Sequence, residues 1–219
     1  MTAGRLRSLE ARLASRSRLS LVRQRAAAIL LPLVGSGDSL SLLFTRRTKS
    51  ISHPGQVAFP GGGVDPSDHN REATAQREAL EEISLPPERV RVLGMLDDIP
   101  NWNNTQAVTP VVGHVDAALL TDLVADPREV ASIFTVPLAD LETASRWTTK
   151  QIPWQGHMST QFFFDVGAYK GSGEGEQLWG LSAYATIALL SAFPDSEMPP
   201  EFARHADLRS RLGAAQSVE

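Results

Sequence analysis

The chain has 219 residues, of which 42% are hydrophobic and 21% charged, enough for one large core with extensions. Its 21 basic and 25 acidic side chains leave a formal net charge of -4, which excludes the positive field of a protein whose main partner is a nucleic acid or an anionic membrane. The absence of cysteine excludes disulfides, thiolate metal sites and cysteine nucleophiles, so any metal must bind oxygen or imidazole ligands.

The first element, residues 1–25, is rich in arginine. It holds seven arginines and one acid, and Leu6, Leu9 and Leu13 recur at helical spacing. This pattern predicts an amphipathic helix that packs on the domain or flanks it, with a mitochondrial transit peptide as the alternative. No secretory apolar region follows the first methionine, and the longest apolar run, residues 26–34, is too short to cross a bilayer. We therefore expect a cytoplasmic protein without a membrane segment.

The next segments predict a hairpin and a glycine loop. Residues 26–34 and 39–45 have the composition of strands, and the turn-forming residues 35–38 join them. A short strand at residues 56–59 is ended by a proline and three glycines at 60–63, which indicate a loop.

The remainder of the chain alternates strands and helices. A helix is expected to begin at residues 67–70, to run through Glu82 and to end near Ser84, before two prolines. Further strands are predicted at residues 90–96, 109–115, 131–137 and 161–166, with a second long helix at 179–193. This order favours an α+β fold or a layered α/β/α sandwich. Flexible loops are expected at 101–106 and 171–177, and a polar tail with a short helix at 200–212 is expected in the segment 194–219.

Three glutamates lie on one face of the first predicted helix. With Glu78 placed at zero, Glu82 lies at about 40° and Glu81 at about −60°, while the apolar residues lie opposite. Like charges at this spacing destabilise a helix by a few tenths of a kcal/mol per pair, so a cation is expected to compensate them. Arg77 can brace one carboxylate, and a hard divalent ion suits the other oxygens. A solvated acidic face is the alternative.

The glycines Gly61, Gly62 and Gly63 precede this helix. Without Cβ atoms they let a ligand approach the backbone closely, although a Pro-Gly-Gly sequence is also typical of a simple turn. The coupling of a glycine run to an acidic helix predicts that substrate phosphate and metal meet between the two.

These residues resemble the Nudix box, a glycine followed six positions later by an acid and then by Arg-Glu-x-x-Glu-Glu-x-Gly. The pattern is carried here by Gly62, Asp68, Arg77, Glu78, Glu81 and Glu82. An aspartate stands at position 68 instead of glutamate, eight residues rather than seven separate it from Arg77, and Ser84 replaces the last glycine. The resemblance implies an α/β/α sandwich with a mixed β-sheet between helices, in a domain covering residues 26–193.

Within this family the chain is most similar to the bacterial coenzyme A pyrophosphatase branch. The matching segments read LFTRR leading to HPGQVAFPGG, then VTPVVG, then the stretch from Glu129 to VPL, and finally WGLSA. The branch has an additional arginine after the first of these, whereas residues 49–52 read KSIS and contain none. Arg46, Arg47 or Lys49 would have to take its place, because a phosphate is gripped best by arginine or a helix N-terminus.

The resemblance implies hydrolysis of a diphosphate, with coenzyme A or its thioesters giving 3′-phospho-AMP and phosphopantetheine. It implies Mg²⁺ or Mn²⁺ held by Glu78 and Glu82, assisted by Glu81 and the Gly61 carbonyl. The catalytic residues implied are Arg77, Glu78, Glu81 and Glu129, with the general base open between the box glutamates and Glu129. Those expected to bind substrate are Arg46, Arg47, Gly61, Gly62, Gly63 and Trp102, which either stacks on a base or packs.

Three other functions are compatible with these residues. The first is a Nudix hydrolase for ADP-ribose, NADH or another nucleoside diphosphate derivative, and the second is a non-catalytic nucleotide sensor. The third, an RNA-binding or decapping role, is opposed by the acidic balance of the chain. The partner expected is a small-molecule nucleotide, with self-association as a homodimer and neither nucleic acid nor membrane. Of the five histidines, only His53, beside the glycines, is a candidate ligand.

Overall fold

A mixed β-sheet lies between helices in the computed structural model, which describes residues 2–49, 54–154, 156–173 and 176–206. The strands are β1 (Arg25–Val34), β2 (Ser41–Arg47), β3 (Val57–Ala58), β4 (Gly61–Gly63), β5 (Arg91–Met95), β6 (Ile99–Pro100), β7 (Gln106–Val115), β8 (Val130–Pro137), β9 (Trp147–Trp154), β10 (His157–Asp165) and β11 (Gln177–Leu178). The helices are α1 (Thr2–Ser15), α2 (Arg71–Ile83), α3 (Leu138–Glu142), α4 (Gly180–Ala192) and α5 (Pro200–Ala206).

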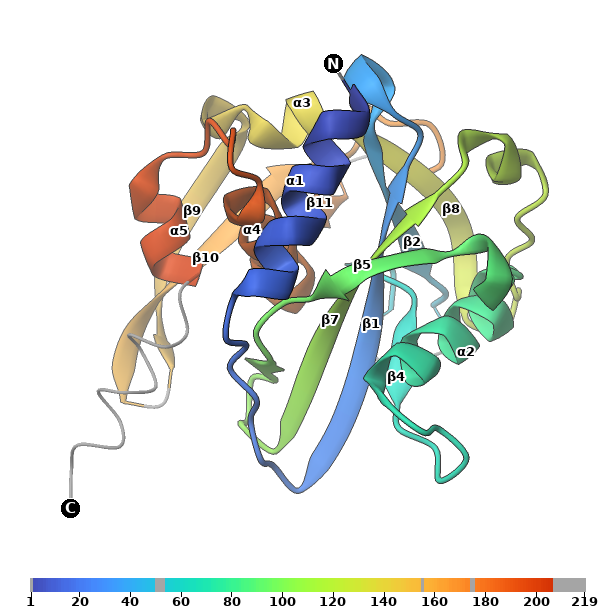
Figure 1. Cartoon of the computed structure of the whole chain (residues 1–219). Coiled ribbons are helices and arrows are strands. Elements are labelled where there is room, and N and C mark those ends of the chain that lie inside the picture. Colours follow the sequence, from blue (N-terminus) through green and yellow to red (C-terminus); the bar gives the residue numbers. More distant parts are fainter. Residues whose placement is uncertain (1, 50–53, 155, 174–175, 207–219) are drawn as a thin grey trace.

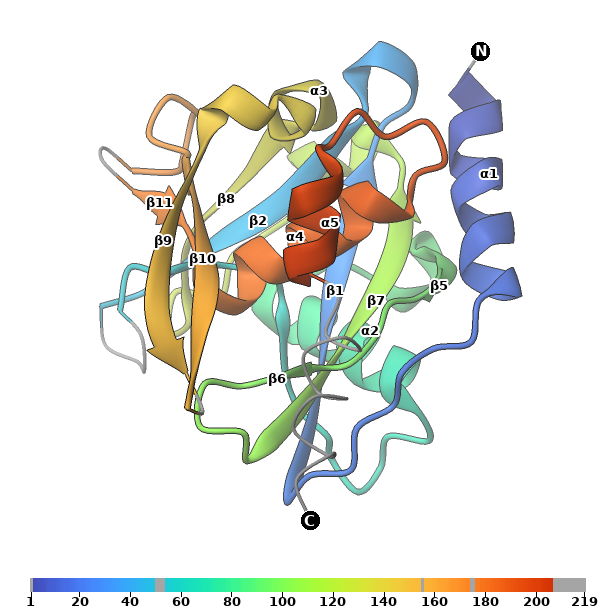
Figure 2. The same cartoon turned by 90° about the vertical axis from the view of Figure 1, so that its left-hand side faces the viewer.

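The main sheet has the order β3-β2-β1-β7-β5, with β4 paired to β1, β6 to β7 and β8 to β2. Strand β1 runs parallel to β7 and antiparallel to β2, which confirms the expected mixed sheet. Helix α2 covers one face, and α1 and α4 cover the other (Figures 1 and 2). A second sheet, β11-β10-β9, stands beside α4. The α/β/α sandwich is therefore confirmed.

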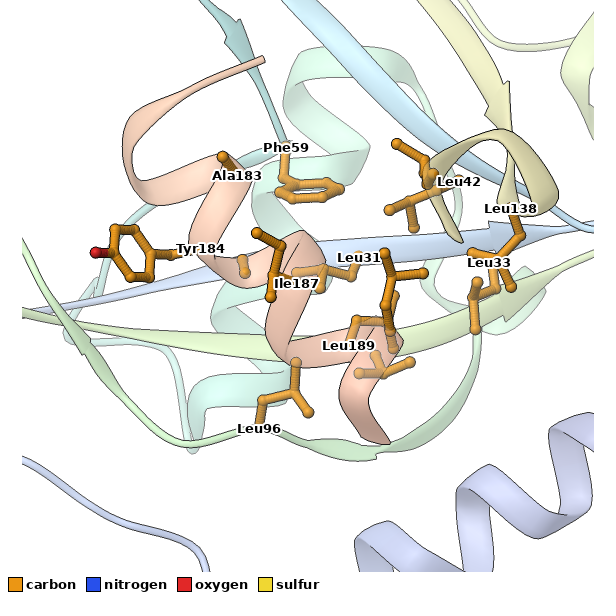
Figure 3. Packing of buried hydrophobic residues seen from close by; sticks show 14 of the residues in the cluster. Leu31, Leu33, Leu42, Phe59, Leu96, Leu138, Ala183, Tyr184, Ile187 and Leu189 are labelled. Atoms are coloured by element: carbon orange, nitrogen blue, oxygen red, sulfur yellow. The ribbon is translucent and has the colours of Figure 1, made fainter. Parts of the chain in front are cut away.

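The two faces of the sheet belong to separate hydrophobic clusters. Along β1, Leu31 and Leu33 join the cluster that contains α1 and α4, whereas Leu30 joins the cluster under α2. Figure 3 shows Leu31 and Leu33 packed near Ile187 and Leu189 of α4. Because side chains alternate along a strand, a strand covered on both faces is apolar at every position, which explains the uninterrupted run at residues 26–34.

The N-terminal helix packs on the sheet. Leu6, Leu9 and Leu13 of α1 are buried in the cluster shared with α4. The segment after α1 is held by Asp98, which is 3% exposed and accepts a hydrogen bond of 2.8 Å from the Leu21 N–H. Helix α1 therefore packs on the domain through these three leucines. Among the described residues, no helix has the length and apolar composition needed to span a bilayer.

Most predicted elements are confirmed, including the β1–β2 hairpin, the strands β5, β7, β8 and β10, and the helices α2 and α4. The prediction of a loop at the three glycines is wrong, because they form β4 and pair with β1. The loop expected at residues 101–106 is present between β6 and β7. There the Asn101 side chain accepts the Thr105 N–H at 2.9 Å and fixes a tight turn.

The C-terminal segment is only partly described. Helix α5 occupies the start of the predicted helix at 200–212, and residues 207–219 lie outside the described residues. Phe202 of α5 packs against Phe162, with ring centroids 5.2 Å apart. This part of the expected polar tail therefore contacts the core.

Both ends of α2 follow from the sequence. Asn70 caps the start, its side chain accepting the Ala73 N–H at 2.8 Å. Ser84 ends the helix in the left-handed conformation, with φ 55°. Glycine adopts this conformation without the steric cost that a Cβ brings, which gives a physical reason for a glycine at this point of the Nudix box.

We expect Ser84→Gly to raise the free energy of unfolding by about 1 kcal/mol, because glycine relieves the left-handed strain. Urea denaturation measures the change. Asn104→Gly is the matched control, since Asn104 has φ 59° but asparagine tolerates this conformation. A Ser84→Gly protein less stable than the parent chain would contradict the account.

Candidate active site

The glycine strand faces helix α2. Strand β4 pairs with β1 from Ala27 to Ile29, and because backbone polar groups alternate along an antiparallel strand, Gly61 and Gly63 direct theirs away from β1. The Gly63 carbonyl accepts a hydrogen bond of 2.9 Å from Arg77 Nη2 of α2. The Gly61 N–H donates to the carboxylate of Glu82. The exposed backbone of β4 is therefore bound by α2.

Two of the glycines are explained by neighbouring atoms that lie too close to their backbone for a Cβ, rather than by a turn. A Cβ at Gly61 would lie 2.5 Å from the Ala28 carbonyl oxygen. A Cβ at Gly62 would lie 2.5 Å from Glu78 Oε1, whereas nothing lies within 4 Å of one at Gly63. Gly62 thus provides the space in which the Glu78 carboxylate lies against the strand.

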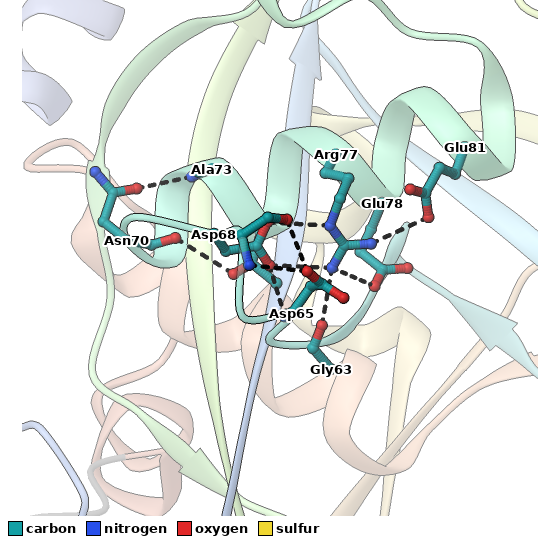
Figure 4. Close-up of polar contacts among 10 residues, drawn as sticks. Gly63, Asp65, Asp68, Asn70, Ala73, Arg77, Glu78 and Glu81 are labelled. Carbon is teal, nitrogen blue, oxygen red and sulfur yellow. Dashed lines mark hydrogen bonds and ion pairs between the residues drawn. The ribbon is translucent and has the colours of Figure 1, made fainter.

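Arg77 orients the acidic face of α2 (Figure 4). Its guanidinium makes two hydrogen bonds to Asp68, of 3.0 and 3.1 Å, and lies 3.0 Å from both Glu78 Oε1 and Glu81 Oε2. The hydrogen bonds from Arg77 hold the pKa of Asp68 well below its usual range. Asp68 therefore stays ionised and braces Arg77 from the loop before α2, despite being one methylene shorter than the usual glutamate.

Glu82, Glu78 and Glu129 lie close enough for the charge of Glu129 to raise the pKa values of the other two. Glu82 is 5% exposed, and burial raises its pKa to about 8, with the charges of Glu78 and Glu129 adding to the effect and that of Arg47 opposing it. Burial also raises the pKa of Glu78, opposed by Arg77 and reinforced by Glu81 and Glu129. Carboxylates that repel one another in this way favour a bound cation.

The available donor atoms fit a divalent ion whose coordination shell is completed by oxygens other than those of side chains. Among the described residues, no three His, Asp or Glu side chains alone form a metal-holding group. Mg²⁺ needs only one or two carboxylates, together with carbonyl, water and substrate oxygens. Glu82 and Glu78, four residues apart on α2, and the backbone of Gly61 are of this type. The hard-oxygen chemistry of the site therefore fits Mg²⁺ or Mn²⁺.

The other predicted acids occupy different positions. Glu81 has a side chain that is 58% exposed and is bound to Arg77, so it lies at the outer edge of the group. Glu129 lies just before β8, far from α2 in sequence, but its loop is bound to α2, because the Asp126 N–H donates to the Glu82 carbonyl at 2.9 Å. The fold thus brings Glu129 to the box glutamates. His53 lies outside the described residues.

A cavity of about 1150 Å³ opens beside the glycine strand. Of the residues expected to bind substrate, it is lined by Arg47, Gly61, Gly62, Gly63 and Trp102. Arg46 is not a lining residue; its Nε donates to Ser132 Oγ at 3.3 Å, and its Nη1 lies 4.0 Å from Glu176. Five of the six predicted substrate residues therefore meet at one cavity.

Sequence reasoning missed one wall of this cavity. Trp154 of β9, Trp179 before α4 and Tyr184 of α4 line it, as does Gln161 of β10. The Trp154 Nε1–H donates to the carbonyl of Trp102 at 2.7 Å, and their ring centroids lie 6.4 Å apart. Three of the chain's four tryptophans line the cavity, although they lie in polar or glycine-rich segments. Large aromatic residues in such segments were the available signal.

The raised pKa of Glu82 predicts how stability depends on pH in metal-free protein. Between the ordinary value of 4.5 and about 8, the folded protein holds a proton that the unfolded chain has lost. The free energy of unfolding should therefore fall as pH rises through this window, by up to about 1.4 kcal/mol per pH unit. Urea denaturation in EDTA tests this, with Glu82→Gln expected to flatten the slope. Stability that increases across the window would refute the assignment.

The fold and the site define the Nudix class of α/β/α sandwich, with a glycine strand held against an Arg-Glu-x-x-Glu-Glu helix. The chain belongs to the Nudix family, since residues 22–155 match the NUDIX domain model. It is 39% identical over 160 residues to an "Uncharacterized Nudix hydrolase NudL" of Photorhabdus laumondii, covering 73% of this chain and 80% of that protein. A NudL of Enterobacter is 41% identical over 137 residues, covering 63% and 70%.

Solved structures with a similar arrangement include a MutT/nudix family protein from Enterococcus faecalis. It is 16% identical, with a TM-score of 0.49, and the match covers 89% of this chain and 71% of that one.

Proposed function

We propose that the chain is a metal-dependent pyrophosphohydrolase that cleaves the diphosphate of coenzyme A or its thioesters, releasing 3′-phospho-AMP and phosphopantetheine or its acyl form. The observation that carries this proposal is the convergence of Glu78, Glu82 and Glu129 at a glycine strand that lines a large cavity. Mutually repelling, partly buried carboxylates are an arrangement that binding and catalysis require and that stability alone disfavours.

Different residues of the site have different roles in the proposed reaction. Glu78, Glu82 and the Gly61 carbonyl would hold Mg²⁺ or Mn²⁺, which when bound would supply charge neutralisation and a more acidic water. Arg77 fixes the Glu78 and Glu81 carboxylates through its contacts with both. Phosphoryl transfer depends on positioning and charge more than on covalent catalysis, so no protein nucleophile is needed.

Glu129 is the general base in this proposal. Among the described residues, its carboxylate has no hydrogen-bond partner, whereas Glu78 and Glu81 are both bound by Arg77. It accepts the proton of the attacking water while the new P–O bond forms and the anhydride P–O bond breaks. The released phosphate leaves with the electron pair of that bond.

The cavity supports a substrate with a nucleotide and an apolar arm. Its volume, about 1150 Å³, is slightly larger than that of most small-molecule sites. Trp102, Trp154 and Trp179 offer stacking surfaces, and Arg47 places a cation beside them. A nucleotide and a pantetheine arm together would use both kinds of surface.

Product analysis with purified protein tests the proposal. The panel is coenzyme A, acetyl-coenzyme A, ADP-ribose, NADH and diadenosine polyphosphates, each with Mg²⁺ or Mn²⁺. Selective release of 3′-phospho-AMP is expected. Cleavage of ADP-ribose or NADH instead would retain the catalytic roles and reject coenzyme A. Binding without turnover of any compound would reject the enzyme in favour of a nucleotide sensor.

A further inference from the structure

The N-terminus of helix α4 opens into the cavity. Trp179, Gly180, Leu181 and Ser182 all line it. Trp179, at the capping position, makes no side-chain hydrogen bond to the helix, and the first turn contains no acid. The first N–H groups of this 13-residue helix therefore have neither a capping side chain nor an internal counter-charge. Such a helix end attracts an anion.

The Ser182 hydroxyl is a second and independent feature of this place. The residue is 7% exposed, and within the described part of the chain its side chain has no hydrogen-bond partner. Because Ser182 lines the cavity, its hydroxyl can donate a hydrogen bond to a ligand bound there. The side-chain amide of Gln56 is a further hydrogen-bond donor close to the start of α4. Its Nε2 lies 3.6 Å from the position that a Cβ on Gly180 would occupy.

We propose that the start of α4, with Ser182 and Gln56, is a second anion site that binds a phosphate monoester of the substrate, apart from the diphosphate at Glu78 and Glu82. Resting on the proposed function, this group is the 3′-phosphate of coenzyme A. A helix N-terminus with a hydroxyl and an amide donor then performs the role of the arginine that residues 49–52 do not supply.

The test compares two ligands that differ by one phosphate monoester. Binding of 3′-phospho-AMP and of AMP to the full chain is measured in EDTA, by calorimetry and by tryptophan fluorescence, since Trp179 adjoins the site. We expect 3′-phospho-AMP to bind about tenfold more tightly. Ser182→Asp should remove this preference while keeping the helix, because an acid in the first turn suits the helix dipole but repels phosphate.

Ser191→Ala is the matched control. Ser191 is another serine of α4; among the described residues its hydroxyl is buried without a partner, but it does not line the cavity. We expect this variant to keep the full preference for 3′-phospho-AMP. If Ser182→Asp does not fold, Ser182→Ala tests the proposal instead, and we expect it to reduce the preference for 3′-phospho-AMP over AMP several-fold. Equal binding of both ligands to the parent chain, or an unchanged preference in the folded Ser182 variant, would overturn the proposal.

Turnover separates this inference from the proposed function. If coenzyme A is not cleaved but the preference for 3′-phospho-AMP exists and depends on Ser182, the anion site stands and the coenzyme A assignment fails. If coenzyme A is cleaved and the Ser182 variants keep kcat/KM for coenzyme A relative to dephospho-coenzyme A, the assignment stands and the anion site fails.

Discussion

Glu82→Gln is expected to lower kcat by about 10³-fold or more while the fold remains intact. Glu82 is buried beside the Gly61 N–H and is the box glutamate most deeply enclosed with Glu78 and Glu129. The substitution removes a charge from the group proposed to hold the divalent ion, and loss of such an electrostatic group costs several kcal/mol of transition-state stabilisation. Steady-state kinetics with saturating Mg²⁺ or Mn²⁺ measure the effect.

The same variant should be more stable than the parent chain in EDTA near pH 8, because it no longer buries an ionised carboxylate there. Glu88→Gln, which changes an exposed glutamate of the turn Pro87–Arg89 in the same way, is the control and should leave both properties near their original values. Turnover of Glu82→Gln close to that of the parent chain would exclude the proposed centre.

Gly62→Ala is expected to lower kcat by about 100-fold. The new methyl would lie 2.5 Å from the Glu78 carboxylate, so this side chain must move away from β4. A displacement of about 1 Å in a positioned group is enough for a loss of this size. The effect should appear in kcat rather than in the binding of 3′-phospho-AMP.

Gly63→Ala provides the comparison. The two glycines are neighbours on one strand, but nothing lies within 4 Å of a Cβ at Gly63. Both variants lose the same backbone freedom, so any difference between them reports contact with Glu78. We expect Gly63→Ala to lose far less turnover than Gly62→Ala. Similar losses in the two variants would show that backbone rigidity, not the place of Glu78, matters at this strand.

Helix α2 was predictable because the sequence signals that define it are local. The spacing of Arg77, Glu78 and Glu82, the cap at Asn70 and the end at Ser84 all lie within one short segment. Helix α2 therefore forms where the sequence predicts it. Strand β4 was not predictable in the same way, because glycines have no side chains to show the alternation by which strands are identified.

The cavity wall depends on contacts between distant segments. Strand β9 begins at the buried Trp147, but most of its remaining residues are exposed, so its composition resembles that of a loop. Only its pairing with β10 brings Trp154 to Trp102. In the same way, no local pattern shows that Glu129 meets α2. Such arrangements follow from topology and not from periodicity.

The separation of the two hydrophobic clusters has an evolutionary consequence. Helix α2, which carries Glu78 and Glu82, packs in one cluster, whereas Ile29 and Tyr184 of the cavity wall belong to the other. Substitutions at distant sites without shared neighbours have nearly additive effects. Under the proposed function, descendants of this chain can therefore acquire a new substrate by changing β9, β10 or the start of α4, while the proposed catalytic carboxylates on α2 remain as they are.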